Sequence, residues 1–441
     1  MTLSSVTVQT TPESQPSIPH WMGEVAAFAQ ILKQTGTLSA ITERVRFARA
    51  RLGTDDLIDF VVVLMGSALS GEPTLQAFDA RLVPFANEFM ALFDRKHLPS
   101  RSALSRFLAA LDQASIEQVR TLFQQDLLAR HPFADLGGIT DRCAESWFMA
   151  DGDGTRKVAR QRALPQTEAL PAPYRRFDRV CAKGHQGRKR GEVVRTRTVV
   201  LQAHPPQLLG TFGGAGNGDD RGELLRALAV LTQYANQVKI PLERILGRLD
   251  GLSGNAAPLF DVLAAHVGVI ARHKDSQLLD LPAVQTVRAG PPAATCTHLE
   301  SQMIRMLFDC PAVPLSAAGP VVRLLVATHL ATAEPPPVGE QRGKTVSERF
   351  VSTLPSPAFS AKDVLDLYRH RGSFETVLSD EDEEQDADRW VSRTAWGQEC
   401  FQILGKSALE PEAGTRPASG SRRRAHDRMC SRARGFASRA Q

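Results

Sequence analysis

The sequence of 441 residues lacks the features of membrane-spanning and secreted proteins. No apolar run reaches the roughly 18 residues that a transmembrane helix needs, and the best candidate, 57–69, contains Asp59. The first twenty residues show no basic segment followed by an apolar one, which a secretory signal would require. We therefore expect no membrane contact and a cytoplasmic protein.

Cysteine and histidine patterns of known sites are also missing. Cysteine is scarce and forms no C-x2-C pair, which argues against a disulfide framework and a structural zinc site; the six cysteines are 143, 181, 296, 310, 400 and 430. The eleven histidines are scattered, and none accompanies a Gly-x-Ser-x-Gly elbow or a cysteine. Nucleophilic catalysis by a histidine pair finds no support.

What the sequence does contain is an uneven distribution of charge. The net charge is +5, but residues 416–441 alone hold eight arginines and one aspartate, which leaves −2 for the rest. Within that remainder, 156–197 has thirteen Lys or Arg against three Asp or Glu, and 378–388 has seven acids and no base. Clustered Lys and Arg favour a polyanion such as DNA. A solvated basic hairpin without a partner is the alternative.

Hydrophobic residues make up 42% and charged residues 23%, as is ordinary for a packed globular protein, and the length allows about three domains. We expect a flexible N-terminus, a helical DNA-binding domain, the first part of an α/β core, a β-rich insertion, a C-terminal catalytic helix region and a basic tail of low complexity. In order, these segments are 1–20, 21–140, 141–272, 273–360, 361–405 and 406–441.

The core is predicted from alternating strand and helix patterns. Short apolar runs that end in turn residues predict strands at 146–151, 196–203, 207–213, 243–250 and 267–272. Leu and Ala at helical spacing predict helices at 222–238 and 257–265, and Ser360 can cap a further helix. This order indicates a mixed α/β sheet.

In the helical domain, one helix start carries two arginines. Ser100 or Ser102 can cap this helix, and Arg101 and Arg106 follow near its beginning. That arrangement could introduce a DNA-reading helix of a helix-turn-helix. A surface amphipathic helix with two incidental arginines is the plainer interpretation.

Three acids stand where carboxylates could converge. Asp153, with Asp151 two residues earlier, follows the first strand, Asp250 follows a later strand, and Glu375 lies on the C-terminal helix. Such carboxylates can hold two Mg2+ ions about 3.5–4 Å apart, which suits phosphodiester chemistry. Each acid also has a plain interpretation, because Asp-Gly after a strand is common in turns and an exposed helical Glu is ordinary.

The C-terminal helix strengthens the chemical interpretation. Tyr368, Arg371 and Glu375 fall at i, i+3 and i+7, on one face and roughly opposite Phe374. Arg suits a phosphate, Glu a metal ion, and Tyr the DNA backbone or stacking.

The spacing Y-x2-R-x3-E at these three residues resembles the signature of DDE transposases of bacterial insertion sequences. The DGT segment at Asp153 is similar to their first catalytic Asp, and the RLDG segment that contains Asp250 is similar to their second. Further similar segments are GRKRGEVVRTRT, GTFGGAGNGDDRGELLRAL and DEDEEQDADRW, and the resemblance covers about 55–405.

The resemblance implies an RNase H-like core, interrupted by a β-rich insertion before its last helix, and an N-terminal domain that binds terminal inverted repeats. Asp153, Asp250 and Glu375 would hold Mg2+, or Mn2+, with Asp151 as an alternate ligand. Tyr368 and Arg371 would contact double-stranded DNA near the cut end. The reaction would be cut-and-paste transposition into target DNA by a homodimer at the nucleoid. The basic residues Arg188, Lys189 and Arg190 fit a DNA-backbone surface on their own chemistry.

The sequence also departs from that family. The lysine that related transposases often carry seven residues after the Glu is Asp382 here, and the likeness fades after about Lys406. The Arg-rich tail is compatible with a DNA-binding extension or with a frameshift. Two alternatives therefore stay open. One is a decayed transposase that only binds specific DNA, and the other is a nuclease that cuts DNA without joining the ends.

Overall fold

Helices alone make up the N-terminal part of the chain. The computed structural model describes residues 17–45, 55–130, 138–158, 181–186, 189–203, 207–216, 218–250, 256–297, 303–316, 319–331, 339–372, 374 and 390–415. The N-terminal elements are α1 (Met22–Gln34), α2 (Thr37–Arg44), α3 (Leu57–Leu69), α4 (Leu75–Leu82), η1 (Val83–Phe85), α5 (Ala86–Ala91), α6 (Arg101–Ala110) and α7 (Gln113–Arg130).

The central helix of this domain is α3, which is apolar on all sides and is buried from Ile58 to Ala68. A helix of this kind has to be enclosed by others. Its one acid, Asp59, closes a capping box with Asp56 and pairs with Arg95, whose Nε lies 2.5 Å from Oδ1. α3 is therefore at the centre of the apolar core that these helices share.

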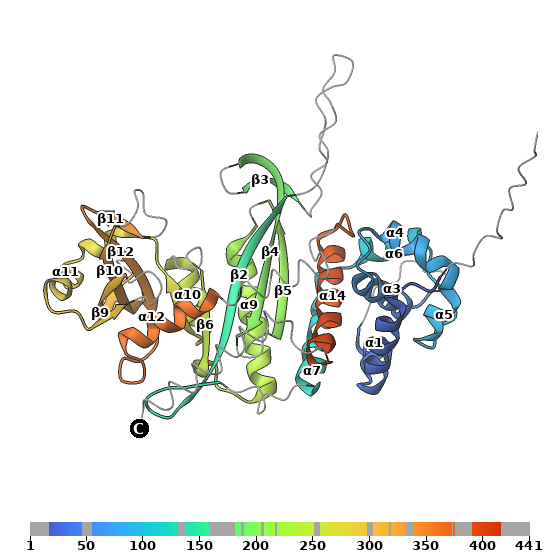
Figure 1. Ribbon diagram of the computed structural model, residues 1–441, viewed down its shortest axis with the longest axis horizontal. Helices are drawn as coiled ribbons and strands as arrows, with labels where there is room; N and C mark the ends of the chain where they lie inside the picture. The colour runs from blue at the N-terminus through green and yellow to red at the C-terminus, as the bar shows by residue number, and fades with distance from the viewer. Residues whose placement is uncertain are drawn as a thin grey trace, which may run out of the picture.

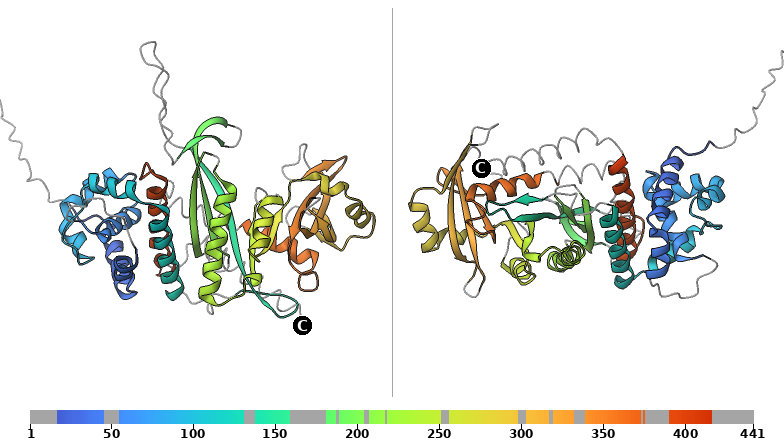
Figure 2. Two further views of the ribbon diagram at one scale, coloured as in Figure 1. Left: turned by 180° about the vertical axis from the view of Figure 1, so that it is seen from behind. Right: turned by 90° about the horizontal axis from the view of Figure 1, so that it is seen from below.

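The last described helix, α14 (Ala395–Thr415), returns to this N-terminal domain. Cys400, Phe401 and Leu404 are buried in the same apolar core as α3 and α7. Figures 1 and 2 show α14 and α7 standing between the other N-terminal helices and the sheet. The tail of low complexity was expected to begin at 406, but α14 continues through that point to Thr415 because its apolar stripe is anchored in this core.

The rest of the described chain is built around one sheet of twelve strands in the order β3-β4-β2-β6-β7-β12-β10-β9-β8, with β1 on β2, β5 on β4 and β11 on β12. The first seven strands are β1 (Ile139–Thr140), β2 (Ser146–Val158), β3 (Ala182–Gln186), β4 (Lys189–Gln202), β5 (Gln207–Ala215), β6 (Ile245–Leu249) and β7 (Gly268–Arg272). The remaining strands are β8 (Ala294–Thr297), β9 (Ile304–Pro314), β10 (Val321–Leu330), β11 (Glu340–Arg342) and β12 (Thr345–Ser352).

Five of these strands form the unit that the sequence predicts. β2, β4 and β5 are an antiparallel meander, whereas β6 and β7 run parallel to β2 on its other side. Helix α9 (Asp220–Val238) connects β5 to β6, and α10 (Ala256–Ala264) connects β6 to β7. The expected mixed α/β sheet with flanking helices is confirmed.

Side chains of β2 alternate between two cores, as a strand buried on both faces requires. Phe148 and Ala150 face α9 and α10, whereas Trp147 and Met149 face the side covered by α12 (Ala361–Arg369). This alternation continues into Asp151 and Asp153, which fixes the face on which they lie.

The β-rich region joins the same sheet, because β12 pairs antiparallel with β7 through Val351 and Ala271. Before these strands come η3 (Ser276–Asp280) and α11 (Pro282–Ala289), which covers the outer strands. After β12, Ser360 caps α12 in a capping box with Asp363. The chain therefore returns from the edge of the sheet to its centre.

A buried cluster of charges connects the helical domain to the sheet. Glu399 of α14 accepts hydrogen bonds from Arg120 of α7 and Arg226 of α9. Both guanidinium groups lie over the ring of Phe212 in β5, at 4.4 Å and 4.8 Å from its centroid. Glu117 completes the set by pairing with both arginines. Since buried charges need such partners, this cluster fixes α7, α9 and α14 against one another.

Candidate active site

Two of the predicted acids lie on neighbouring parallel strands. β2 pairs with β6 in a register that matches Asp151 with Arg248 and Gly152 with Leu249. The next step of that register puts Asp153 beside Asp250, just after β6 ends. Side chains two residues apart on a strand share a face, so both acids lie on the side that α12 covers.

The prediction that the first strand stops at Asp153 was wrong. β2 continues to Val158 because β4 remains paired with it, through Asp153 and Val199 and on to Val158 and Val194. Asp153 thus lies within a strand, at the point where only the parallel partner ends. The backbone N–H of Gly154 donates to its Oδ1 at 2.8 Å.

Asp151 serves a different purpose from the one expected. Arg248 donates from Nε and Nη2 to its two carboxylate oxygens, both at 2.6 Å, and the two side chains are 0% and 1% exposed. A buried charge needs such a partner. Because both oxygens of Asp151 are engaged in this bidentate pair, its assignment as an alternate metal ligand does not agree with the structure.

Helix α12 and the turn that follows it bring Tyr368 and Arg371 to this face. Nη2 of Arg371 lies 2.6 Å from Oδ2 of Asp153 and donates to the carbonyl oxygen of Gly152 at 3.1 Å. The ring of Tyr368 packs on Phe350 at 5.0 Å between centroids. Both residues predicted from the helical spacing therefore border the two acids.

The helix itself differs from the prediction. The α-helix ends at Arg369 and continues as a 3-10 turn, η4 (His370–Gly372). The guanidinium of Arg371 lies 5.7 Å from the ring centroid of Phe374, so the two side chains are neighbours. Arg371 was expected roughly opposite Phe374, so that expectation was wrong. Glu375 lies outside the described residues.

The electrostatics of the site centre on Asp153. Burial raises the pKa of its carboxyl group, Arg371 opposes that rise, and the negative charge of Asp250 adds to it. Burial also raises the pKa of Tyr368, next to Arg272, Arg371 and Asp250. Two carboxylates that repel each other in a partly buried site suit a divalent cation with oxygen ligands. Among the described residues, no three His, Cys, Asp or Glu side chains form a metal-binding group.

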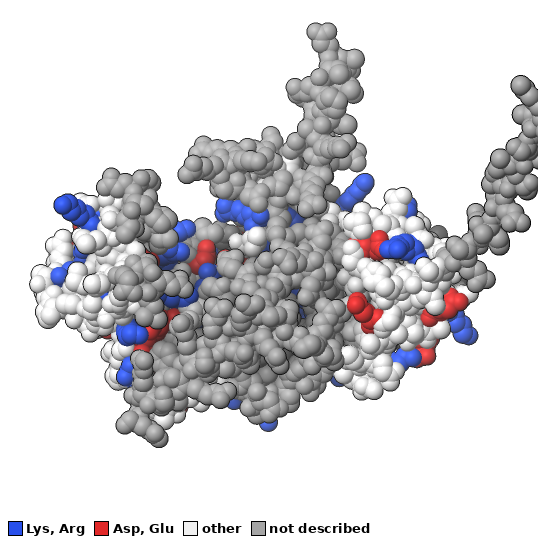
Figure 3. All heavy atoms as spheres, viewed as in Figure 1, with Lys and Arg blue, Asp and Glu red and all other residues white. Residues whose placement is uncertain are grey.

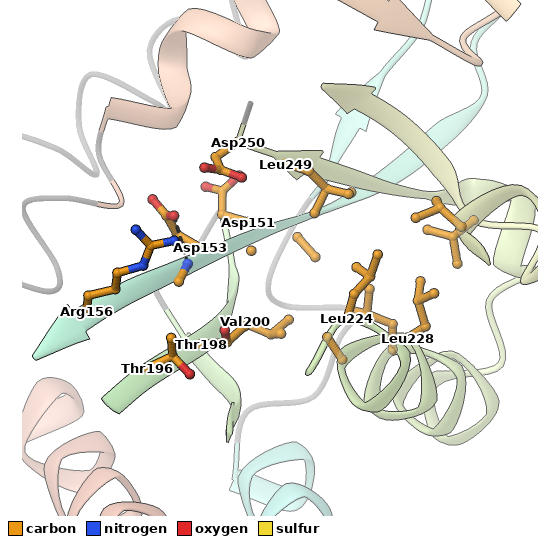
Figure 4. Close-up of a pocket in the computed structure, with 18 residues that line it drawn as sticks. Asp151, Asp153, Arg156, Thr196, Thr198, Val200, Leu224, Leu228, Leu249 and Asp250 are labelled. Atoms are coloured by element: carbon orange, nitrogen blue, oxygen red, sulfur yellow. Dashed lines mark hydrogen bonds between the residues drawn. The ribbon is translucent and has the colours of Figure 1, made fainter. Parts of the chain in front are cut away.

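A pocket is lined by all three acids and by residues of α9. Figure 4 shows Asp151, Asp153 and Asp250 close together, and Leu224 and Leu228 of α9 apart from them. Thr196 and Thr198 of β4 form part of its wall, and both hydroxyls donate to the buried carboxylate of Glu223. Since Thr198 lies opposite Gly154 and the leucines belong to the core under α9, most of this pocket lies across the sheet from the face that α12 covers.

Two of the other predicted DNA contacts lie in the helical domain, on α6. Arg101 and Arg106 are exposed on α6, whose N-cap is Ser100 as predicted. In the view of Figure 3, both acidic and basic side chains lie on the described part of the helical domain. Lys189 and Arg190 start β4, but their side chains are not described, and Arg188 lies outside the described residues.

Sequence reasoning missed two residues of the site, Arg248 and Arg272. Arg248 stands between Gly247 and Leu249 in an apolar strand, and a cation in such a run signals a buried partner. It also donates from Nη1 to the carbonyl oxygen of Leu367 at 2.7 Å, which ties β6 to α12. Arg272 ends β7 and hydrogen-bonds Tyr368, and nothing in its local sequence indicates that contact.

No protein-family model matches the chain, and no curated protein matches it. Among solved structures, it is similar to a cryo-EM structure of the piggyBac transposase synaptic complex with hairpin DNA. The TM-score is 0.39 at 10% sequence identity, over 91% of this chain and 78% of that one. This similarity is too distant to assign a function. In the described part of the chain, no helix is both long and apolar enough to cross a membrane.

Proposed function

We propose that this protein is a DDE-type DNA transposase of the bacterial insertion-sequence kind, with an RNase H-like catalytic core. The observation that carries the proposal is the meeting of Asp153 and Asp250 on adjacent parallel strands, beneath a helix that contributes Tyr368 and Arg371. The meander of β2, β4 and β5, followed by parallel β6 and β7, supports an RNase H-like core. The β-rich segment before α12 agrees with the insertion in that core.

In this proposal, Asp153, Asp250 and Glu375 hold the metal ions. Their oxygen donors and the mutual repulsion of Asp153 and Asp250 fit Mg2+ or Mn2+. These residues would hold two such ions, which would supply Lewis-acid activation of a water or 3′-hydroxyl and stabilisation of the leaving oxygen of a phosphodiester. Arg371 and Tyr368 bind the DNA backbone beside the scissile phosphate, where a guanidinium suits the phosphate oxygens.

The rest of the chain supplies DNA binding. The N-terminal helical domain, with Arg101 and Arg106 exposed on α6, binds the terminal inverted repeats. The basic stretch with Arg188, Lys189 and Arg190 contacts the backbone of double-stranded DNA. The protein acts as a homodimer on paired ends, cleaves them and joins them to target DNA in the cytoplasm, at the nucleoid.

The test uses the purified chain and a DNA fragment that spans its own gene with both flanks. With Mg2+ or Mn2+, we expect paired breaks at inverted repeats on either side of the gene, mapped by sequencing the cut ends. Omission of the metal is the control and should leave the fragment intact. Binding without breaks would favour a decayed transposase, and breaks without joined products would favour a nuclease. Breaks in the absence of metal would contradict the proposed mechanism.

A further inference from the structure

The carboxylate of Asp153 is already held by the protein itself. Nη2 of Arg371 lies 2.6 Å from its Oδ2, and the N–H of Gly154 donates to its Oδ1 at 2.8 Å. The side chains of Arg371 and Asp153 are only 14% and 16% exposed. A metal ion that uses this carboxylate therefore meets a positive charge at the same oxygen.

Arg371 also has a hydrogen-bond donor to spare. Its Nε is buried and has no acceptor among the described residues. A guanidinium presents five N–H donors in a planar fork that matches phosphate oxygens. In its present position Arg371 uses Nη2 on Asp153 and on the carbonyl oxygen of Gly152. A phosphate could accept from both Nε and an Nη, which the pair with Asp153 does not achieve.

We infer that Arg371 and the divalent cation compete for Asp153, and that a DNA phosphate decides the competition by taking Arg371 away. The inference rests on the proposed function, because it assigns the metal to Asp153. Without DNA, Arg371 occupies the oxygen and its charge repels the cation. With DNA, Arg371 turns to the phosphate and Asp153 becomes available. DNA and metal must then strengthen each other's binding by the same factor.

The first experiment measures Mn2+ affinity of the full chain without DNA, by electron paramagnetic resonance of free Mn2+. We expect Arg371→Gln to bind Mn2+ about tenfold more tightly than the wild type, within the usual range of such couplings. Asp153→Asn should lose this binding. Arg142→Gln is the matched control for general charge, because Arg142 is 53% exposed and pairs with Asp363 at the start of α12, outside the site. It should change the affinity less than about twofold.

The second experiment repeats the titration with a short duplex of arbitrary sequence, which engages the backbone-binding surface. Asp153→Asn with the same duplex gives the Mn2+ that the DNA itself binds. The wild type should gain about fivefold or more in Mn2+ affinity from the duplex, whereas Arg371→Gln should gain little.

The outcomes separate the two proposals. If Arg371→Gln binds Mn2+ no better than the wild type, while Asp153→Asn still loses binding, the competition is refuted and the metal centre stands. Equal tightening by Arg142→Gln and Arg371→Gln would reduce the effect to general charge and also refute the competition. If the wild type, Arg371→Gln and Asp153→Asn all bind Mn2+ equally weakly, the proposed metal centre itself fails.

Discussion

Asp153→Asn and Asp250→Asn are each expected to lower metal-dependent DNA cleavage by about 10^3-fold or more. Asn keeps the size of the side chain but removes the charge that a divalent cation requires. A loss of this size corresponds to about 4 kcal/mol of transition-state stabilisation, which is within the range of a metal ion acting on a phosphodiester. Cleavage of the mapped element ends, followed as single-turnover rates on gels, measures the loss.

DNA binding should survive these two substitutions, since clustered Lys and Arg elsewhere dominate backbone affinity. Fluorescence anisotropy with the same duplex checks this. Asp366→Asn is a matched control, because Asp366 is on α12 but pairs with exposed Lys362 at 2.5 Å. It should cleave at the wild-type rate. If Asp153→Asn or Asp250→Asn also cleaves at that rate, the affected residue does not hold the metal. Glu375→Gln tests the third predicted ligand in the same assay.

Much of the core could be predicted because its signals are local. Apolar periodicity and turn residues indicate each of these elements, which are the strands β2, β4, β5, β6 and β7 and the helices α9 and α10. The juxtaposition of Asp153 and Asp250 depends on the parallel pairing of β2 with β6. These strands are not consecutive, since β3, β4, β5 and α9 lie between them along the chain. The start of α12 was predictable from Ser360, an ordinary N-cap residue.

The unpredicted features depend on residues that are far apart in sequence. The end of β2 could not be placed from DGDGT alone, because β4 extends the strand through those glycines. The prediction of a low-complexity tail from 406 did not include the end of α14. This helix is stabilised by burial against α3 rather than by helix-forming composition. The ion pair of Asp151 with Arg248 spans 97 positions. No local pattern identifies the partner in such a contact, although a charged residue in a buried strand indicates that it has one.

Removing one partner of that buried pair should strongly destabilise the protein, because the other charge would stay buried without its partner. In Arg248→Met, the Asp151 carboxylate stays 1% exposed and loses both of its charged hydrogen bonds. We expect the free energy of unfolding to fall by about 3–5 kcal/mol, as for other broken buried ion pairs. Urea unfolding followed by circular dichroism measures the change. Asp151→Asn should also destabilise, because it leaves the Arg248 cation buried.

The double variant Asp151→Leu with Arg248→Met distinguishes a paired charge from a simple loss of packing. With both charges removed, stability should return to within about 1–2 kcal/mol of the wild type, because apolar replacements of a buried pair are often neutral. Exposed Lys362 and Asp366 provide the control pair, and their substitution should cost about 0.5 kcal/mol or less. If the double variant is as unstable as Arg248→Met, packing and the bond to the Leu367 carbonyl hold β6 to α12, and charge does not. The alignment of Asp250 with Tyr368 and Arg371 would then depend on that single backbone contact.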